Sequence, residues 1–381
     1  MQESPNTEML RCWAEIDGAA LRHNARAAGA LAGGGPECVM AVVKADAYGH
    51  RLPLVTRALK EEIGSFAVAA LTEALAVKLH AARARDGSIP PIYILSPALP
   101  AEIPDIVHHG FIPAISTMDE VHRFAAAAHG KSCAVHVVLD TGMGRMGALP
   151  GDAAAVLRAV KDSPVLTLDS VSSHFPSSDE DREFTARQEQ DFRRLTAALQ
   201  AEFGPFRTHI ANSAAILHYP RPPLETVRAG LMLYGICPLN GYTSSLRPAL
   251  TWKTRITLIR ELPAGWTISY GRTFTTPHPM TVAAIAAGYG DGYPRHVSGK
   301  GAAVLVHGQR CPILGRVTMD QILIDVSALP QPPAPGHEAV LLGLQGTASI
   351  TPHELASQAS TIPWHIYTGI TDRTERLFTT E

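Results

Sequence analysis

From about residue 16 to residue 235 the sequence alternates between short apolar runs and longer stretches rich in alanine, leucine, arginine and glutamate. Apolar residues in the longer stretches, such as 71–85 and 186–203, are spaced three and four positions apart, which is the helical period. The runs expected to form buried strands are 38–44, 66–70, 92–95, 112–116, 134–140, 166–174, 208–212 and 225–230. Strand–helix alternation predicts a parallel sheet. Eight such units in about 220 residues fit an α/β fold of the TIM-barrel type, (β/α)8, which typically takes about 250 residues.

The pattern changes after Pro238, where the polar segment 240–248 leads into β-type runs interrupted by proline and glycine. Only 351–360 looks helical there, with Thr351 as N-cap and Pro352 in the first turn. We therefore expect a segment 1–15 that packs with the second domain, a barrel over 16–240, and a mainly β domain over 241–381.

Charge and cysteine usage exclude several classes of protein. The net charge of −2 shows no basic excess, which argues against nucleic acid or an anionic membrane surface as a partner. The five cysteines are scattered and lack metal-ligand spacing, so we expect a reducing compartment and no metal site. Residues 1–5 do not begin a signal peptide, and no uncharged apolar run approaches the ~20 residues that span a bilayer. These features predict a cytoplasmic protein.

Reactive side chains stand at the C-terminal ends of the predicted strands, where a barrel carries its active site. They are Lys44, Asp140, His174, Asn212, Ser213 and Arg228. Polar strand ends are common, but a lysine that closes an apolar strand needs a reason, because lysine is rarely buried without a partner. A desolvated lysine forms Schiff bases readily. Lys44 is therefore expected to form a Schiff base.

Segment 42–50, VVKADAYGH, resembles the signature of the alanine racemase family. Eight further motifs recur in the family's order, and together the nine cover nearly the whole chain, which makes the resemblance specific. These eight are 13–27, 140–147, 173–180, 209–215, 227–235, 268–274, 288–295 and 315–321.

The resemblance implies two bases on opposite faces of the substrate carbanion. Lys44 resembles the pyridoxal-phosphate lysine that also acts on the D-enantiomer, and Tyr270 resembles the base for the L-enantiomer. Tyr270 would come from the partner subunit of a homodimer, so that the active site is shared. His174, and through it Arg228, would activate this tyrosine, since a free phenol is a weak acid. Arg228 would face the pyridine nitrogen and keep it unprotonated, which should suppress side reactions such as transamination.

Further roles follow from the same resemblance. The phosphate would be held by Tyr48, Ser213 and the backbone N–H groups of Gly230 and Leu231. The substrate carboxylate would meet Arg145 and Met319, Tyr289 would line the entrance, and His209 and Asp320 would have supporting roles. The chain departs from the family pattern at Val138, Thr318, Arg51, Trp364–His365 and Arg373–Arg376. Trp364 stands where the family has a tyrosine near the phosphate, so its indole keeps the bulk in an altered geometry. These changes bear on substrate range and affinity rather than on activity.

Other functions remain open at this point. A broader or serine-preferring racemase would share the fold, because one methylene or hydroxyl changes binding by only ~1–3 kcal/mol. A decarboxylase would lack Tyr270 and place an acid at the pyridine nitrogen, and a non-catalytic pyridoxal-phosphate carrier would lack the β domain. Residues 142–147 match a dinucleotide-binding glycine pattern, but Pro150 interrupts the helix that this pattern requires. The leading expectation is an alanine racemase that supplies D-alanine for peptidoglycan. The sequence does not distinguish this biosynthetic role from a catabolic one.

Overall fold

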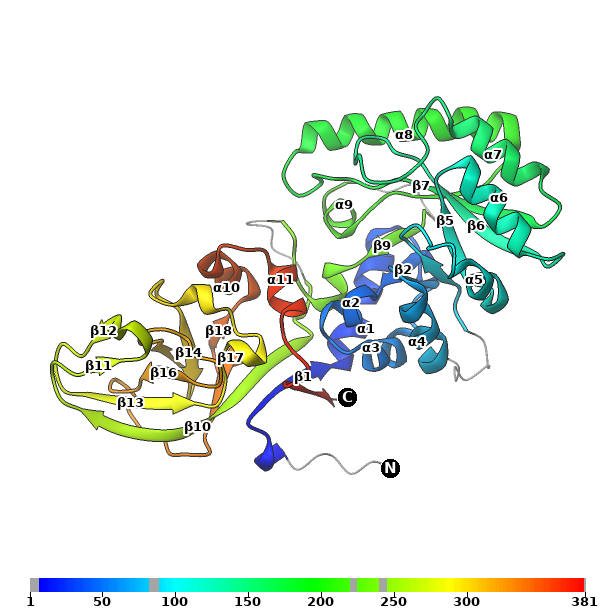
Figure 1. Cartoon of the computed structure of the whole chain (residues 1–381). Coiled ribbons are helices and arrows are strands. Elements are labelled where there is room, and N and C mark those ends of the chain that lie inside the picture. Colours follow the sequence, from blue (N-terminus) through cyan, green and yellow to red (C-terminus); the bar gives the residue numbers. More distant parts are fainter. Residues whose placement is uncertain (1–6, 82–88, 220–224, 240–244, 380–381) are drawn as a thin grey trace. The chain divides into compact units, whose positions relative to one another are not determined.

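The computed structural model describes residues 7–81, 89–219, 225–239 and 245–379, and the chain forms two compact units (Figure 1). One unit contains residues 19–47 and 52–247 and is called the barrel unit here. The other, the β-rich unit, contains the chain up to residue 18, residues 48–51, and everything from residue 248 onward. Residues 1–5 and part of the polar connector, 240–244, lie outside the described residues.

The barrel unit is built on parallel strands in the order β8-β7-β6-β5-β4-β3-β2-β9. A backbone hydrogen bond from Arg228 to the carbonyl of Ala211, 2.9 Å long, links β9 to the chain that follows β8. Each predicted apolar run overlaps one of these strands, with starts that differ by a residue at β3, β6 and β8, so the eight-stranded parallel sheet is confirmed. The strands are β2 (Val39–Val42), β3 (Ser65–Val68), β4 (Ile92–Ile94), β5 (Ile112–Ile115), β6 (Cys133–Val138), β7 (Leu166–Ser172), β8 (Arg207–His209) and β9 (Val227–Ala229).

Helices follow the strands in the sequence, and α6, α8 and α9 begin at side-chain caps. Thr117 and Glu120 form a capping box at the start of α6, and Asp181 caps the long helix α8. These caps satisfy N–H groups that the first turn leaves without helical partners. The helices are α1 (Gly18–Leu31), α3 (Leu52–Leu59), α4 (Leu71–Ala81), α5 (Ile103–His109), α6 (Met118–Ala127), α7 (Ala153–Asp162), α8 (Arg182–Phe203) and α9 (Ser213–His218). The predicted helix 71–85 is described to residue 81, and residues 82–88 lie outside the described part.

The β-rich unit is organised around the long strand β10, whose side chains alternate between buried and partly exposed along its first half. The main path of its sheet runs β15-β14-β17-β10-β1-β19, with β13 and β16 joined through β10 and β18 paired with β17. These strands are β1 (Cys12–Asp17), β10 (Leu250–Leu262), β13 (Met280–Ile285), β14 (Ala303–Val306), β15 (Gln309–Pro312), β16 (Ile322–Asp325), β17 (Glu338–Gln345), β18 (Ala348–Ile350) and β19 (Glu375–Thr379). A separate hairpin joins β11 (Thr267–Ile268) to β12 (Phe274–Thr275).

The N-terminal strand β1 belongs to this β-rich sheet, where it pairs antiparallel with β10 and parallel with β19. Two short helices complete the unit, α10 (Pro352–Ala359) and α11 (Pro363–Thr368). The predicted cap of α10 is confirmed, because the Thr351 hydroxyl accepts a hydrogen bond from the Glu354 N–H at 3.1 Å. Nowhere in the described part of the chain does a helix combine the length and apolar character that crossing a bilayer requires.

Candidate active site

Lys44 follows β2 directly and opens a turn of unusual handedness. Residues 45–48 all have φ between 53° and 55°, which makes one left-handed helical turn, α2 (Lys44–Tyr48). Each non-glycine residue in this conformation costs roughly 1–2 kcal/mol. Three hydrogen bonds compensate: the Ala47 N–H bonds to the carbonyl of Val43 at 2.9 Å, Glu73 accepts from the Ala45 N–H at 2.6 Å, and Asp46 accepts from the Leu52 N–H at 2.7 Å. Strain held in this way is typical of functional sites.

The electrostatics around Lys44 favour a neutral amine. Burial, the Arg145 cation and the Arg228 cation lower the pKa of Lys44, while the Glu73 carboxylate raises it. Glu73 was absent from the sequence predictions, although an acidic residue in the first turn of a helix after a neighbouring strand is a recognisable signal. Its carboxylate is shared with the N–H groups of Ala45 and Ala69. Two cations, Arg145 and Arg228, thus act on Lys44 against one carboxylate, and this excess of positive charge favours an anionic ligand in the barrel unit.

Arg228 lies inside the barrel unit in β9 and is almost fully enclosed. Its guanidinium donates to His209 Nδ1 at 2.6 Å, to the carbonyl oxygens of His209, Ile210 and Ser173, and to His174 Nδ1 at 3.1 Å. Burial lowers the pKa of Arg228 to about 10, so it stays cationic at neutral pH. Of the N–H groups of the Arg228 guanidinium, only Nε–H has no hydrogen-bond partner among the described residues.

His174 and His209 are both neutral. Burial and the cations of Arg228, Arg145 and Lys44 lower the pKa of His174 to about 3, and burial and Arg228 lower the pKa of His209 well below its usual value. Since arginine can only donate, each histidine presents a lone pair on Nδ1 to Arg228. Each therefore carries its proton on Nε2.

Ser213 begins α9, and its hydroxyl group is tied to the backbone that follows β9. Its hydroxyl oxygen accepts from the N–H groups of Gly230, at 3.0 Å, and Met232, at 3.3 Å. The hydroxyl proton is then left to donate. Asn212, which the sequence placed at a strand end, caps the same helix through the Ala215 N–H and accepts from the Ser178 hydroxyl. The structure gives Asn212 an architectural role.

The glycine-rich segment 142–147 forms a loop around a carboxylate. Asp140 accepts hydrogen bonds from the N–H groups of Gly142, Met143 and Gly144, all between 2.9 and 3.1 Å. Helix α7 begins only at Ala153, so the segment does not open a helix as a dinucleotide fingerprint would. The loop instead holds the exposed Arg145, which acts electrostatically on Lys44, His174 and Arg228. Val138, one of the positions that depart from the family pattern, is buried in β6.

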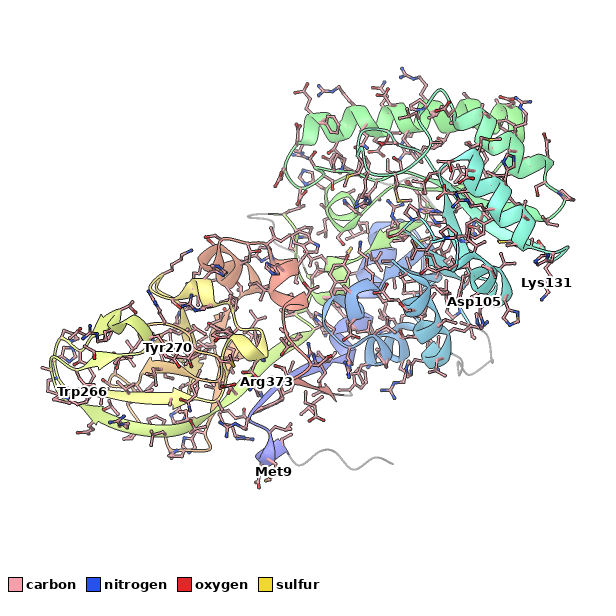
Figure 2. All side chains as sticks on the ribbon, in the orientation of Figure 1. Met9, Asp105, Lys131, Trp266, Tyr270 and Arg373 are labelled. Carbon is pink, nitrogen blue, oxygen red and sulfur yellow. The ribbon has the colours of Figure 1, made fainter. Side chains whose placement is uncertain are left out.

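The remaining predicted residues lie in the β-rich unit. Tyr270, which Figure 2 labels, follows β11. Its side chain is 69% exposed, and Met319 and Tyr289 are 51% and 40% exposed. The motifs that carry Met319 and Tyr289 are joined, because the N–H groups of Tyr289 and Gly290 bond to the carbonyls of Thr318 and Met319. Large side chains this exposed are available to something outside the unit.

Three further predicted site residues lie in the β-rich unit, namely Asp320, Tyr48 and Trp364. Arg373 pairs with Asp320 at 2.8 Å, so Asp320 is tied to the C-terminal motif that departs from the family. Tyr48 ends the left-handed turn, and burial raises its pKa to about 12. Trp364 lies half-buried in α11. Within its unit the structure thus gives each a position, while their roles toward a ligand remain predictions.

Comparison with known proteins covers both units. Residues 16–238 match the family model for the alanine racemase N-terminal domain, and residues 249–378 match the model for the alanine racemase C-terminal domain. An alanine racemase of Methylacidiphilum infernorum is 38% identical over 94% of this chain and 90% of its own length. One from Syntrophobacter fumaroxidans is 39% identical over 95% of this chain and 96% of its own.

Solved structures agree with the sequence comparison. The alanine racemase of Streptomyces coelicolor A3(2) superposes with a TM-score of 0.89 at 34% identity, covering 98% of this chain and 99% of that one. The alanine racemase of Bacillus anthracis with bound L-Ala-P gives a TM-score of 0.85 at 32% identity, covering 97% and 95%. Both domain models, in order and over nearly the whole chain, match one family. The chain belongs to the alanine racemase family.

Proposed function

We propose that this chain interconverts L-alanine and D-alanine with pyridoxal phosphate as cofactor. The observation that carries the proposal is the group of cations around Lys44: a half-buried lysine with a lowered pKa, flanked by Arg145 and Arg228. A phosphate and a substrate carboxylate are the anions such a group would bind. Membership of the alanine racemase family supports the choice of reaction, and the L-Ala-P in the Bacillus anthracis relative supports the choice of substrate.

The barrel unit fits the cofactor at three places. Lys44 can offer a neutral amine, since its surroundings lower its pKa. The Nε–H of Arg228, which has no partner among the described residues, can donate to a pyridine nitrogen, and the Ser213 hydroxyl can donate to a phosphate. Gly230, Leu231, Tyr48 and Trp364 are proposed as further cofactor contacts.

Pyridoxal phosphate, when bound, supplies an electron sink that stabilises negative charge at the substrate Cα. The chain's own residues then decide where protons move. Lys44 Nζ removes or returns the Cα proton on one face of the substrate. Arg228, which stays cationic at neutral pH, can only donate a hydrogen bond to the ring nitrogen and does not give up its proton, so that nitrogen stays unprotonated.

Tyr270 is proposed as the base on the opposite face, contributed by a second copy of the chain. Its exposure of 69% supports a role outside its own unit. His174 would assist it, because its Nε2–H is free of Arg228 and can donate to a phenolate oxygen. Arg145 and Met319 are proposed to hold the alanine carboxylate, with Tyr289 at the entrance and Asp320 and His209 in support. In this assignment residues 16–240 bind the cofactor and residues 241–381 supply the second base.

The test separates cofactor binding from the two-base assignment. A visible absorbance band of the purified protein should disappear in Lys44→Ala, and a wild-type protein that binds no pyridoxal phosphate would refute the proposal. In Tyr270→Phe, deuterium wash-in from solvent should collapse for L-alanine and persist for D-alanine. Equal loss for both enantiomers would contradict separate bases. Activity of a purified monomer equal to that of a dimer would contradict a shared site.

Substrate preference and biological role are part of the proposal. We assign alanine, and a supply of D-alanine for peptidoglycan, on the strength of the relatives' names. Optical rotation measured over a panel of L-amino acids tests this directly. A turnover of serine above that of alanine would favour the broader racemase instead.

A further inference from the structure

Gln188 lies inside the barrel unit on the long helix α8, and its side-chain amide contacts two separate segments. The NH2 group donates to the Thr141 hydroxyl at 3.0 Å and to the carbonyl of His174 at 2.9 Å. The residue is only 2% exposed. Gln188 was not among the predicted site residues, because glutamine in a helical stretch is usually a surface residue. Its burial therefore needs a reason.

The orientation of the Gln188 amide is fixed by its partners. A carbonyl oxygen can only accept, so the NH2 group and not the side-chain oxygen must face His174. The other N–H of that group serves Thr141, whose hydroxyl can then donate to the Ser173 hydroxyl 2.7 Å away. The side-chain oxygen of Gln188 is buried and has no hydrogen-bond partner among the described residues. An unpaired buried acceptor costs free energy, which indicates that the two donated bonds are what this glutamine contributes.

Through Thr141, Gln188 holds the loop of residues 140–147, which is called the Arg145 loop here. The carboxylate of its first residue, Asp140, binds three N–H groups of the loop. Backbone hydrogen bonds of 2.9 and 2.8 Å join the two ends of the loop. A loop tied within itself in this way moves largely as one piece, so a bond at Thr141 also restrains Arg145.

Helix α8 presents a second residue to the Arg145 loop. Phe184 and Gln188 are four positions apart, which places them on one face of the helix. A Cβ added to Gly142 would lie 3.1 Å from the Phe184 ring, so the ring packs closely against the loop backbone. The helix thus supports the loop by packing at Gly142 and by a hydrogen bond at Thr141.

The second bond of Gln188 holds the segment that contacts Arg228. The carbonyl of Ser173 and Nδ1 of His174 both accept from Arg228, and Gln188 binds the next carbonyl, that of His174. Besides burial, the Arg145 cation lowers the pKa of His174 and of Arg228, so it lies within electrostatic reach of both. One buried amide therefore joins the loop of one cation to the segment that binds the other.

We propose that Gln188 is a positioning residue for Arg145: it ties the Arg145 loop to the backbone at His174 and so sets where this cation lies relative to Arg228. The link itself stands on the hydrogen bonds of Gln188 and Thr141. Its consequence for the reaction rests on the proposed function, in which Arg145 holds the alanine carboxylate.

Matched variants test the link. Gln188→Met keeps the length of the side chain and removes both donors, while Gln190→Met makes the same change at an exposed position of the same helix. Thr141→Val removes the hydroxyl and keeps the shape, and Thr141→Ser keeps the hydroxyl. The readout is hydrogen–deuterium exchange of the holoenzyme, followed by mass spectrometry on the peptide that covers the Arg145 loop. We expect about tenfold faster exchange in Gln188→Met and Thr141→Val, since one lost hydrogen bond can shift local opening by that factor. Gln190→Met and Thr141→Ser should exchange like the wild type.

Kinetics test the positioning role. Thr141→Val should raise the KM for alanine about fivefold and leave kcat within about twofold, because it frees the loop and spares the bond to His174. Gln188→Met should raise the KM by a similar factor. The double variant should raise it no further, because both changes break one link. A purely structural loss would lower the melting temperature and the yield of active enzyme without changing the KM.

Each result decides one part of the proposal. Unchanged exchange of the Arg145 loop in Gln188→Met would overturn the link, and if that variant does not fold, unchanged exchange in Thr141→Val would do so. Faster exchange with an unchanged KM would overturn the positioning role. A protein that binds no pyridoxal phosphate would refute the proposed function, while the exchange measurements would still decide whether Gln188 holds the loop.

Discussion

Two glycines in the loop that carries Arg145 differ in what a methyl group would meet, and Gly147→Ala and Gly144→Ala exploit that difference. Gly147 has φ of 113°, and an added Cβ would lie 2.6 Å from the backbone nitrogen of Asp140 and 2.8 Å from the carbonyl carbon of Leu139. Gly144 has φ of 69°, and its added Cβ would meet nothing within 4 Å. The same substitution therefore carries a clash at one position and only backbone strain at the other.

The cost of each change follows from this geometry. At Gly144 the left-handed conformation costs about 1–2 kcal/mol, and stiffening of the unfolded chain offsets roughly 0.4–1 kcal/mol of it. At Gly147 the φ lies outside the left-handed well, which costs of order 1–3 kcal/mol, and forcing the backbone apart adds about 1–3 kcal/mol. We expect roughly 3–5 kcal/mol for Gly147→Ala, against about 1 kcal/mol for Gly144→Ala.

The cost of Gly147→Ala can appear either as a lower melting temperature or as a displacement of the loop that carries Arg145, and both are measured. If the loop keeps its shape, the melting temperature of Gly147→Ala falls by about 6–20 °C, taking ~2–4 °C per kcal/mol. If the loop moves, Arg145 is displaced and the KM for alanine rises about tenfold, because a displacement near 1 Å is enough to disturb a positioned ligand. Gly144→Ala should shift both quantities little. Equal behaviour of the two variants in both assays would refute the clash at Gly147.

Three further predictions concern the core and a cap. Arg228→Lys should destabilise the protein by about 3–5 kcal/mol in urea unfolding, since a lysine cannot serve His209 and three carbonyls together and leaves buried acceptors unpaired; a loss below 1 kcal/mol would contradict this. Burial lowers the pKa of His136 to about 4 and, with nearby cations, that of His174 to about 3, while both titrate near 6.5 when unfolded. The unfolded chain then binds more protons, so stability should fall as pH drops from about 6.5 toward 4, and a flat urea midpoint over that range would argue against buried neutral histidines. Thr351→Ala should lower the free energy of unfolding by about 1 kcal/mol, because the α10 cap is lost. An unchanged melting temperature would contradict this prediction.

The sequence was sufficient for the barrel because its strands are apolar, short and separated by helical patterns, and periodicity reports such features directly. It could not reveal the left-handed turn at residues 45–48. Alanine and tyrosine favour right-handed helices locally, and the turn depends on Glu73 and on the Leu52 N–H, which are brought there by the fold. Handedness at this point is therefore a tertiary property.

Polar side chains inside strands were missed for a similar reason. Tyr93 and Asp169 read as members of apolar strands, and only a bulge in β7 at Asp169 explains how its carboxylate reaches the Tyr93 hydroxyl. Local sequence patterns also could not predict that residues 48–51 belong to the β-rich unit. Gly49 lies so close to the carbonyl of Tyr367 that a Cβ would come within 2.2 Å of its oxygen, and Arg376 donates to the carbonyl of Gly49. Such contacts join segments more than 300 residues apart.

The placement of β1 in the β-rich sheet has a consequence for synthesis on the ribosome. This strand, Cys12–Asp17, emerges first, but its partners are β10, Leu250–Leu262, and β19, Glu375–Thr379. The barrel strands β2 to β8, in contrast, pair with the strands next along the chain. Pairings of high sequence separation form slowly, and domains form as their residues emerge. The barrel strands can therefore assemble during translation, while β1 waits for β10 and keeps its other edge unpaired until β19, near the end of the chain, is made.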